Sequence, residues 1–220
     1  MKTLAIISQK GGSGKTTLAV HLSVAAEQRG LKAALFDLDP QASAASWADR
    51  RNSPYPAVLA AQAPRLAALI AQAETQEADL VIIDSAPNAD TASLAAAKAA
   101  DLILIPCRPS AFDLNAIGTT LSLAAVAGKP AYVVLNGVPS QGRLADEARD
   151  ALNKSGIQVA EPVLHHLIAF SHAVNDGRTA QEYDAKCKAA AEIDALFTWI
   201  KKHANIQTRL RTNTKTRKHA

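Results

Sequence analysis

Short, continuous apolar runs alternate along this chain with longer segments in which apolar positions recur at helical spacing. Five of the runs are bounded by turn residues, and a sixth, near 157–164, is weaker. Because the runs are continuously apolar rather than alternating with polar residues, we expect strands that are covered on both faces. The five stronger runs lie at 3–8, 32–37, 79–84, 101–106 and 131–136.

The segments between these runs are rich in alanine and therefore favour helix. The alternation of strand and helix predicts an α/β fold: a doubly wound, mostly parallel sheet with helices on both faces. In such a sheet ligands bind at the carboxyl ends of the strands, so functional loops should follow strands. The expected helices lie at 15–29, 41–51, 60–76, 89–99, 113–127, 142–154 and 180–203.

A glycine-rich segment stands between the first apolar run and the first helical pattern. Its glycines let backbone N–H groups converge on phosphate oxygens, and the helix dipole favours an anion there. Lys15 adds a positive charge, and Thr16 is placed to hold Mg²⁺ through its hydroxyl. A turn that merely caps a helix is the alternative, although strand, loop, Lys-Thr-Thr and helix stand in the order that a phosphate loop requires. The residues expected to bind the phosphates are Lys10, Gly11, Gly12, Ser13, Gly14, Lys15, Thr16 and Thr17.

Carboxylates close two of the predicted strands. Asp84 ends the third run and best fits a carboxylate that holds Mg²⁺, while Asp39 lies just past the second run, where it could position an attacking water. The alternative makes them helix caps, and Asp39 before Pro40 does resemble one. Asp37, nearer the strand body, stays ambiguous.

Composition limits the remaining possibilities. A chain of 220 residues with 48% hydrophobic residues can bury one core, so we expect a domain over 1–204 and a disordered tail over 205–220. The sequence has neither a long apolar stretch nor a secretory leader, which favours a cytoplasmic protein. Cys107 and Cys187 form no C-x-x-C pair, which disfavours a disulfide scaffold or a metal-cluster site.

With these features the chain resembles the ParA/MinD family of deviant-Walker-A P-loop ATPases over roughly its first 200 residues. The loop departs from the common spacing as that family does: Gln9 stands where a glycine is usual, and a second lysine, Lys10, opens the loop. Within the family the chain looks most like the short ParA proteins of plasmid and chromosome partition. The matching segments are Lys10–Thr17, Asp37–Gln41, Asp84–Pro87, Pro106–Pro109, Phe112–Asp113, Asn136 and Lys188–Ile193.

The resemblance implies an ATPase with ATP and Mg²⁺ at a homodimer interface. Lys10 would reach across to the phosphates bound by the partner subunit, although a plain surface lysine is the alternative. Lys15 and Thr16 would bind the phosphates and Mg²⁺, and the catalytic residues would be Lys10, Lys15 and Asp39. Asp84 would be the Walker B acid that helps to hold Mg²⁺, and Asn136 would read the adenine edge.

Partition relatives bind nonspecific DNA in the ATP state, and often through arginines near 164–169, where this chain has His166 and Ala169. His165 and His166 are either weak phosphate contacts or ordinary structural residues. The C-terminus is basic and poor in large apolar residues, so it favours DNA over membrane, although it could simply be a solubilising end. The candidate DNA-binding residues are Lys201, Lys202, Arg209, Arg211, Lys215, Arg217 and Lys218.

Two functions remain open at this point. One is a nucleoid-associated bacterial partition ATPase that segregates DNA, whose hydrolysis is stimulated by a centromere-binding partner protein. The other is a P-loop switch, MinD-like or a scaffold, that positions some other cargo.

Overall fold

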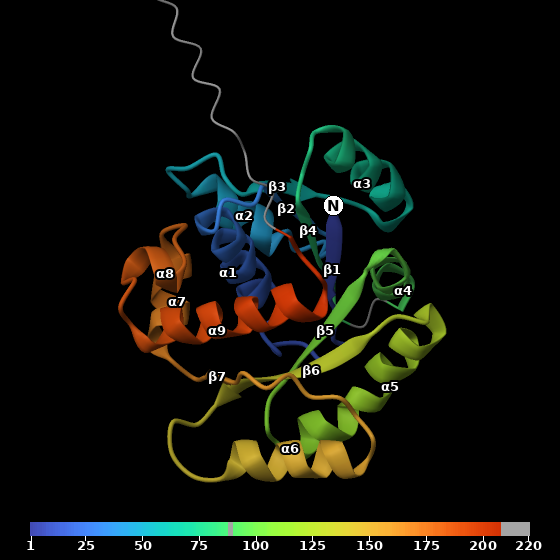
Figure 1. Ribbon diagram of the computed structural model, residues 1–220, viewed down its shortest axis with the longest axis vertical. Coiled ribbons are helices and arrows are strands. Elements are labelled where there is room, and N and C mark those ends of the chain that lie inside the picture. The colour runs from blue at the N-terminus through green and yellow to red at the C-terminus, as the bar shows by residue number, and fades with distance from the viewer. Residues whose placement is uncertain (88–89, 208–220) are drawn as a thin grey trace, which may run out of the picture.

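The protein is described by a computed structural model over residues 1–87 and 90–207, and it is built around a seven-stranded sheet in which every pairing is parallel (Figure 1). The order across the sheet is β3-β2-β4-β1-β5-β6-β7. The strands are β1 (Lys2–Ile6), β2 (Ala33–Asp37), β3 (Ala57–Ala60), β4 (Leu80–Asp84), β5 (Leu102–Cys107), β6 (Ala131–Val138) and β7 (Leu164–His165).

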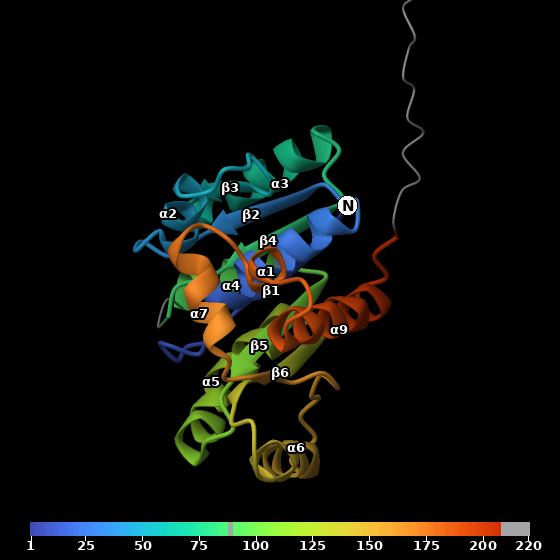
Figure 2. The same ribbon diagram turned by 90° about the vertical axis from the view of Figure 1, so that its left-hand side faces the viewer.

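Helices cover both faces of the sheet, as the sequence predicts (Figures 1 and 2). Side chains of successive strand residues point to opposite faces, so Leu4 and Ile6 pack with one helical layer and Ala5 with the other. The first layer holds α1 (Lys15–Gln28), α2 (Ser43–Asp49), α7 (Ile168–Asn175), α8 (Ala180–Tyr183) and α9 (Lys188–His203). The second holds α3 (Leu66–Thr75), α4 (Asp90–Ala99), α5 (Ala111–Ala127) and α6 (Leu144–Lys154).

The five stronger strand predictions are confirmed, and the differences concern short or exposed elements. The weak run near 157–164 forms only an isolated bridge at Val159 and the two-residue β7. Strand β3 and helix α7 were not predicted, and β3 ends at Ala60, the first residue of the helix expected at 60–76. The helix begins three residues later than expected, with a 3₁₀ turn at Ala63–Arg65, and continues as α3.

The last helical region is divided, because the backbone becomes extended at Asp184 and a new helix begins after Cys187. The sulfur of Cys187 accepts a hydrogen bond from the backbone N–H of Ala190 and caps α9, which separates this helix from α8. Cys107 and Cys187 are both free thiols. Beyond α9, Ile206 is buried in the core, so the packed body reaches at least this residue.

No helix in the described part of the chain is both long enough and apolar enough to cross a membrane.

Candidate functional site

The central strands bring the predicted loop and both acidic segments to one edge of the sheet. The register pairs Ile6 of β1 with Asp84 of β4, and Asp84 in turn with Asp37 of β2. Because parallel strands all end at the same edge, the phosphate loop after β1 lies beside these carboxylates. The topology thus joins three segments that are up to 74 residues apart in the chain, from Lys10 to Asp84.

The phosphate loop enters α1 through Gly14, which adopts a left-handed conformation with φ of 93°. A Cβ atom at this position would lie 2.3 Å from Nδ2 of Asn136, so any side chain would collide with that amide. No side chain caps α1, which leaves backbone N–H groups of its first turn to an outside partner. The N-terminus of α1 therefore has the geometry of an anion site.

The two lysines of the loop lie in different environments. Lys15 is buried, and its Nζ donates a hydrogen bond to the backbone carbonyl of Lys10 at 3.3 Å. Burial lowers the pKa of Lys15, while the negative charges of Asp84 and Asp39 oppose this shift. The Lys10 residue is exposed. One cation thus belongs to the interior of the site and the other faces outward.

Asp84 is fully buried, and neither of its carboxylate oxygens has a partner in hydrogen-bond geometry among the described residues. Burial raises its pKa to about 7, opposed mainly by the nearby hydroxyl of Thr16. A buried acid without a partner is costly, and Mg²⁺ prefers oxygen ligands such as a carboxylate and a hydroxyl. Asp84 and Thr16 therefore fit the binding of Mg²⁺.

Asp37 and Asp39 lie two positions apart in the sequence but make different contacts. Asp37 is buried and accepts hydrogen bonds from the backbone N–H groups of Asp39, Ala44 and Ala45, so it anchors the start of α2. Burial raises its pKa, and these hydrogen bonds oppose the shift. Asp39 accepts a bond only from the neighbouring Gln41 N–H, at 2.9 Å, among the bonds described. The backbone N–H groups in the first turn of α2 are thus held by Asp37 rather than by Asp39, and a water-positioning role for Asp39 stays a prediction.

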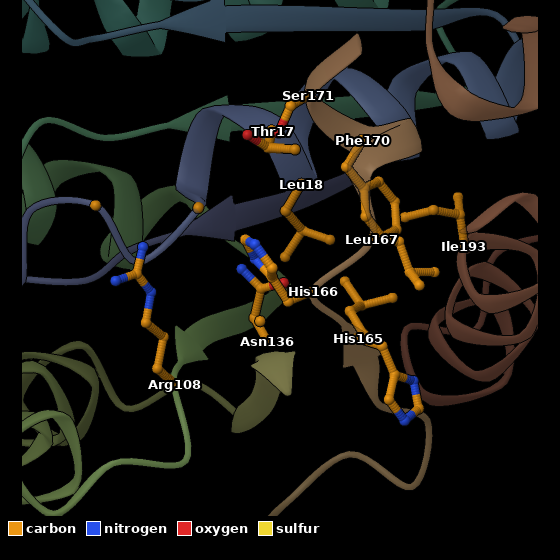
Figure 3. A pocket seen from close by; sticks show the side chains of 14 residues that line it. Thr17, Leu18, Arg108, Asn136, His165, His166, Leu167, Phe170, Ser171 and Ile193 are labelled. Atoms are coloured by element: carbon orange, nitrogen blue, oxygen red, sulfur yellow. The ribbon is translucent and has the colours of Figure 1, made fainter. Parts of the chain in front are cut away.

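A cleft of about 280 Å³ opens beside the loop (Figure 3). Arg108, after β5, extends toward the loop and comes within 3.8 Å of the place where a side chain on Gly12 would begin. Leu167 and Phe170 from α7 and its approach form another wall. Arg108 was noted in the sequence only as part of a matching segment, and the α7 residues gave no signal because the helix itself was not predicted.

Asn136 lies in this cleft, but its amide also holds the loop. Its Nδ2 donates a hydrogen bond to the carbonyl of Ser13 at 2.7 Å. The two consecutive histidines, His165 and His166, lie differently. His166 lines the cleft near Asn136, whereas the ring of His165 turns away from it (Figure 3). His165 bonds to Glu192 of α9 through its backbone N–H and through Nδ1, at 2.9 and 2.6 Å. His165 is therefore held as a structural contact.

The two candidate DNA-binding residues that the structure describes lie apart from the loop. Lys201 and Lys202 lie in the last turn of α9, which ends at the opposite edge of the sheet from the loop (Figure 2). Arg209, Arg211, Lys215, Arg217 and Lys218 lie outside the described residues.

Comparison with known proteins agrees with this geometry. Residues 4–180 match the model of the CobQ/CobB/MinD/ParA nucleotide binding domain. A "Maintenance of carboxysome distribution protein A" of Gloeobacter kilaueensis is 35% identical over 199 residues, covering 88% of this chain and 90% of the relative. Protein ParA of Rhizobium radiobacter is 28% identical, covering 78% of this chain and 81% of the relative.

Among solved structures, a variant of Cyanothece McdA in complex with ATP has the same fold. It aligns with a TM-score of 0.74 at 22% identity and covers 96% of this chain and 99% of its own. The family match extends over most of the chain and includes the loop, the acids and the cleft residues up to Ser171. The chain therefore belongs to the CobQ/CobB/MinD/ParA nucleotide-binding family, and within it is a P-loop ATPase of the ParA/MinD type.

Proposed function

We propose that the protein is an ATP-switched positioning ATPase, which dimerises around ATP and Mg²⁺, holds nonspecific DNA in that state and carries a cargo along it. The observation that carries this proposal is the pair of lysines in one loop. Lys15 is buried in its own site while Lys10 is exposed, which leaves Lys10 free to act on a nucleotide held by a second subunit.

The other residues of the site support hydrolysis at this interface. Backbone N–H groups of the loop and Lys15 hold the β- and γ-phosphates, and Thr16 and Asp84 hold Mg²⁺, which offsets phosphate charge. The carboxylate of Asp39 accepts a bond only from the Gln41 N–H among the bonds described, and it orients the attacking water. Lys10 of the opposing subunit stabilises charge that develops on the transferred phosphoryl group, as an arginine finger does.

Asn136 has a second task in this scheme. Its hydrogen bond to Ser13 uses the amide nitrogen, so its oxygen remains to accept a bond from an adenine amino group in the cleft.

Two substitutions test the switch. Asp39→Ala should bind ATP and accumulate as a dimer, whereas Lys10→Ala should bind ATP and stay monomeric, both measured by size-exclusion chromatography with light scattering. Lys15→Ala, which should lose nucleotide binding, is the control. A strictly monomeric Asp39→Ala protein in ATP would contradict the two-subunit model.

The cargo has two candidates, and each is supported by relatives. The ParA relatives favour a DNA replicon, recognised through a centromere-binding partner protein that stimulates hydrolysis. The relative of 35% identity, named for carboxysome distribution, favours a protein-bounded compartment instead.

Deleting the gene in its source cells separates the two cargoes. Increased loss of a plasmid or chromosome with normally spaced compartments supports segregation, and stable replicons with clustered compartments support the second candidate. DNA binding that is independent of ATP would contradict both.

A further inference from the structure

The start of the phosphate loop is attached to α5, a helix from the other half of the sheet. The backbone N–H of Gln9 donates a hydrogen bond to the hydroxyl oxygen of Thr120, at 3.2 Å across 111 residues of sequence. Thr120 lies in the middle of α5 and is only 2% exposed. A side chain far from the loop in sequence thus fixes the residue that precedes Lys10.

The peptide groups of Lys10 itself are also held. Its backbone N–H donates to the hydroxyl of Ser8, and its carbonyl accepts a bond from Nζ of Lys15, each at 3.3 Å. Together with the bond to Thr120, these contacts fix consecutive backbone groups at the point where the Lys10 side chain leaves the loop. The point from which that side chain leaves the loop is therefore fixed by its anchored backbone.

The surroundings of Thr120 indicate that its hydroxyl is there for this bond. The other buried positions on the same side of α5 include Ile117 and Ala124, which are apolar and pack in the core. Valine would fill nearly the same volume as threonine at position 120, but it would leave the Gln9 N–H without this acceptor. Thr119, one residue earlier, is exposed and offers a matched comparison on the same helix.

We propose that Thr120 is a positioning residue for Lys10: by holding Gln9, its hydroxyl aims the Lys10 side chain toward the nucleotide of the partner subunit. This inference rests on the role of Lys10 given under Proposed function. It predicts that loss of the hydroxyl slows turnover without weakening the binding of nucleotide to the subunit's own loop, because Gly14, Lys15 and Thr16 keep their places.

The test compares Thr120→Val with Thr120→Ser, which restores the hydroxyl, and with the control Thr119→Val. A displaced catalytic group slows the reaction markedly, so we expect kcat for ATP hydrolysis to fall about tenfold in Thr120→Val. The Kd for ADP, measured by calorimetry, should stay within about twofold of the original protein, because the bonds to the phosphates are unchanged. Thr120→Ser and Thr119→Val should retain the original kcat.

A double-mutant cycle with Lys10→Ala separates positioning from a general structural effect. Since Thr120 acts through Lys10, adding Thr120→Val to Lys10→Ala should cause no further loss of kcat. Losses that multiply in the double variant, an unchanged kcat in Thr120→Val, or a parallel loss of ADP binding would each overturn the inference.

Thermal unfolding of every variant checks that it is folded. If Thr120→Val does not fold, Thr120→Ala takes its place in the same test. An unchanged kcat in Lys10→Ala would instead overturn the proposed role of Lys10, and the inference with it. A normal kcat in Thr120→Val beside an impaired Lys10→Ala overturns the inference alone.

Discussion

His21 connects the phosphate-binding helix to a distant part of the chain through both of its ring nitrogens. Its Nδ1 lies 2.7 Å from the carbonyl of Thr17, and its Nε2 accepts a hydrogen bond from the backbone N–H of Ala180 at 3.0 Å. Because Nε2 accepts, the ring is neutral with its proton on Nδ1. Complete burial lowers the pKa of His21 to about 4, so this neutral form is the stable one in the folded protein.

A prediction for stability against pH follows from His21. In the unfolded chain the ring has its ordinary pKa of 6.5, so between pH 6.5 and about 4 the unfolded state binds a proton that the folded state does not. The contribution of His21 is complete above pH 6.5 and is lost as the pH falls toward 4, by up to about 3 kcal/mol. The difference in unfolding free energy between the original protein and His21→Asn, measured by urea titration, should therefore be smaller at pH 4 than at pH 7 by this amount.

The comparison of two proteins at each pH removes a competing effect. The raised pKa of Asp84 acts in the opposite direction, since its buried carboxylate is destabilising at higher pH, but both proteins share it. A gap that does not change with pH would show that His21 is not buried in its neutral form.

At this scale the sequence predicts what is local. The loop and Asp84 could be predicted as site residues because each combines a strand end with a characteristic residue type within a few positions. The contacts of Asp37, His21 and Thr120 could not be predicted, because each depends on partners that only the three-dimensional fold brings near. Asp37 illustrates this, since its role depends on α2 beginning at Ser43 rather than at residue 41.

At the scale of elements, α2 and the α7–α8 segment are locked together beside the site. Arg51, just past α2, pairs with Glu182 through two hydrogen bonds of 3.0 and 2.8 Å, and its guanidinium stacks on Trp47. The ring nitrogen of Trp47 donates to the carbonyl of Arg178. Both ends of α2 are thus fixed, the first by Asp37 and the second by Trp47 and Arg51.

Gly177, between α7 and α8, lies very close to the backbone at the end of α2, and a substitution there tests this contact. Its φ is 78°, and an added Cβ would lie 2.6 Å from backbone atoms of Arg50. Gly30 has nearly the same φ, 76°, but open space around it. Gly30→Ala should lose about 1–2 kcal/mol of unfolding free energy from backbone strain, and Gly177→Ala should lose roughly twice that or more.

Chemical denaturation of both glycine variants checks this comparison. Because strain is matched between them, the excess loss in Gly177→Ala measures the tight contact between α2 and the α7–α8 segment. Equal losses in the two variants would mean that the segments separate readily.

The elements missed from sequence share a physical cause. Strand β3 lies at the edge of the sheet and is mostly exposed, and its four residues, although all apolar, form a shorter strand than β4 or β5 at the centre. Helix α7 has few buried positions: among its eight residues, only Ala173 is fully buried. Both elements form because the rest of the fold supports them, and local pattern carries little of that information.

At the scale of the whole molecule, charge is divided between body and C-terminus. Residues 1–200 carry a net charge of −3, while the whole chain carries +4, because seven Lys and Arg residues and no acid follow residue 200. A folded body with a negative net charge does not by itself favour the binding of a polyanion such as DNA. If the ATP-bound dimer holds DNA, as we propose, the C-terminal residues are the strongest candidates for the contact.

Removing the tail after Gln207 tests this assignment, and the boundary matters because Ile206 is buried in the core. Five Lys and Arg residues lie beyond this point. Their removal should reduce the steepness with which the logarithm of the DNA-binding constant falls with the logarithm of salt concentration, by up to about 4–5 units per subunit. DNA affinity of the ATP-bound protein should fall accordingly at low salt, measured by fluorescence anisotropy over a salt series, while ATP affinity stays constant.

A full-length variant with these five residues changed to glutamine is the matched control, because it keeps the length of the chain and removes only its charge. It should bind DNA as weakly as the truncated protein, since the interaction depends on phosphate contacts rather than on the presence of the segment. Unchanged affinity and slope in both proteins would move the DNA contact into the folded body, where Lys201 and Lys202 at the end of α9 would be the next residues to change.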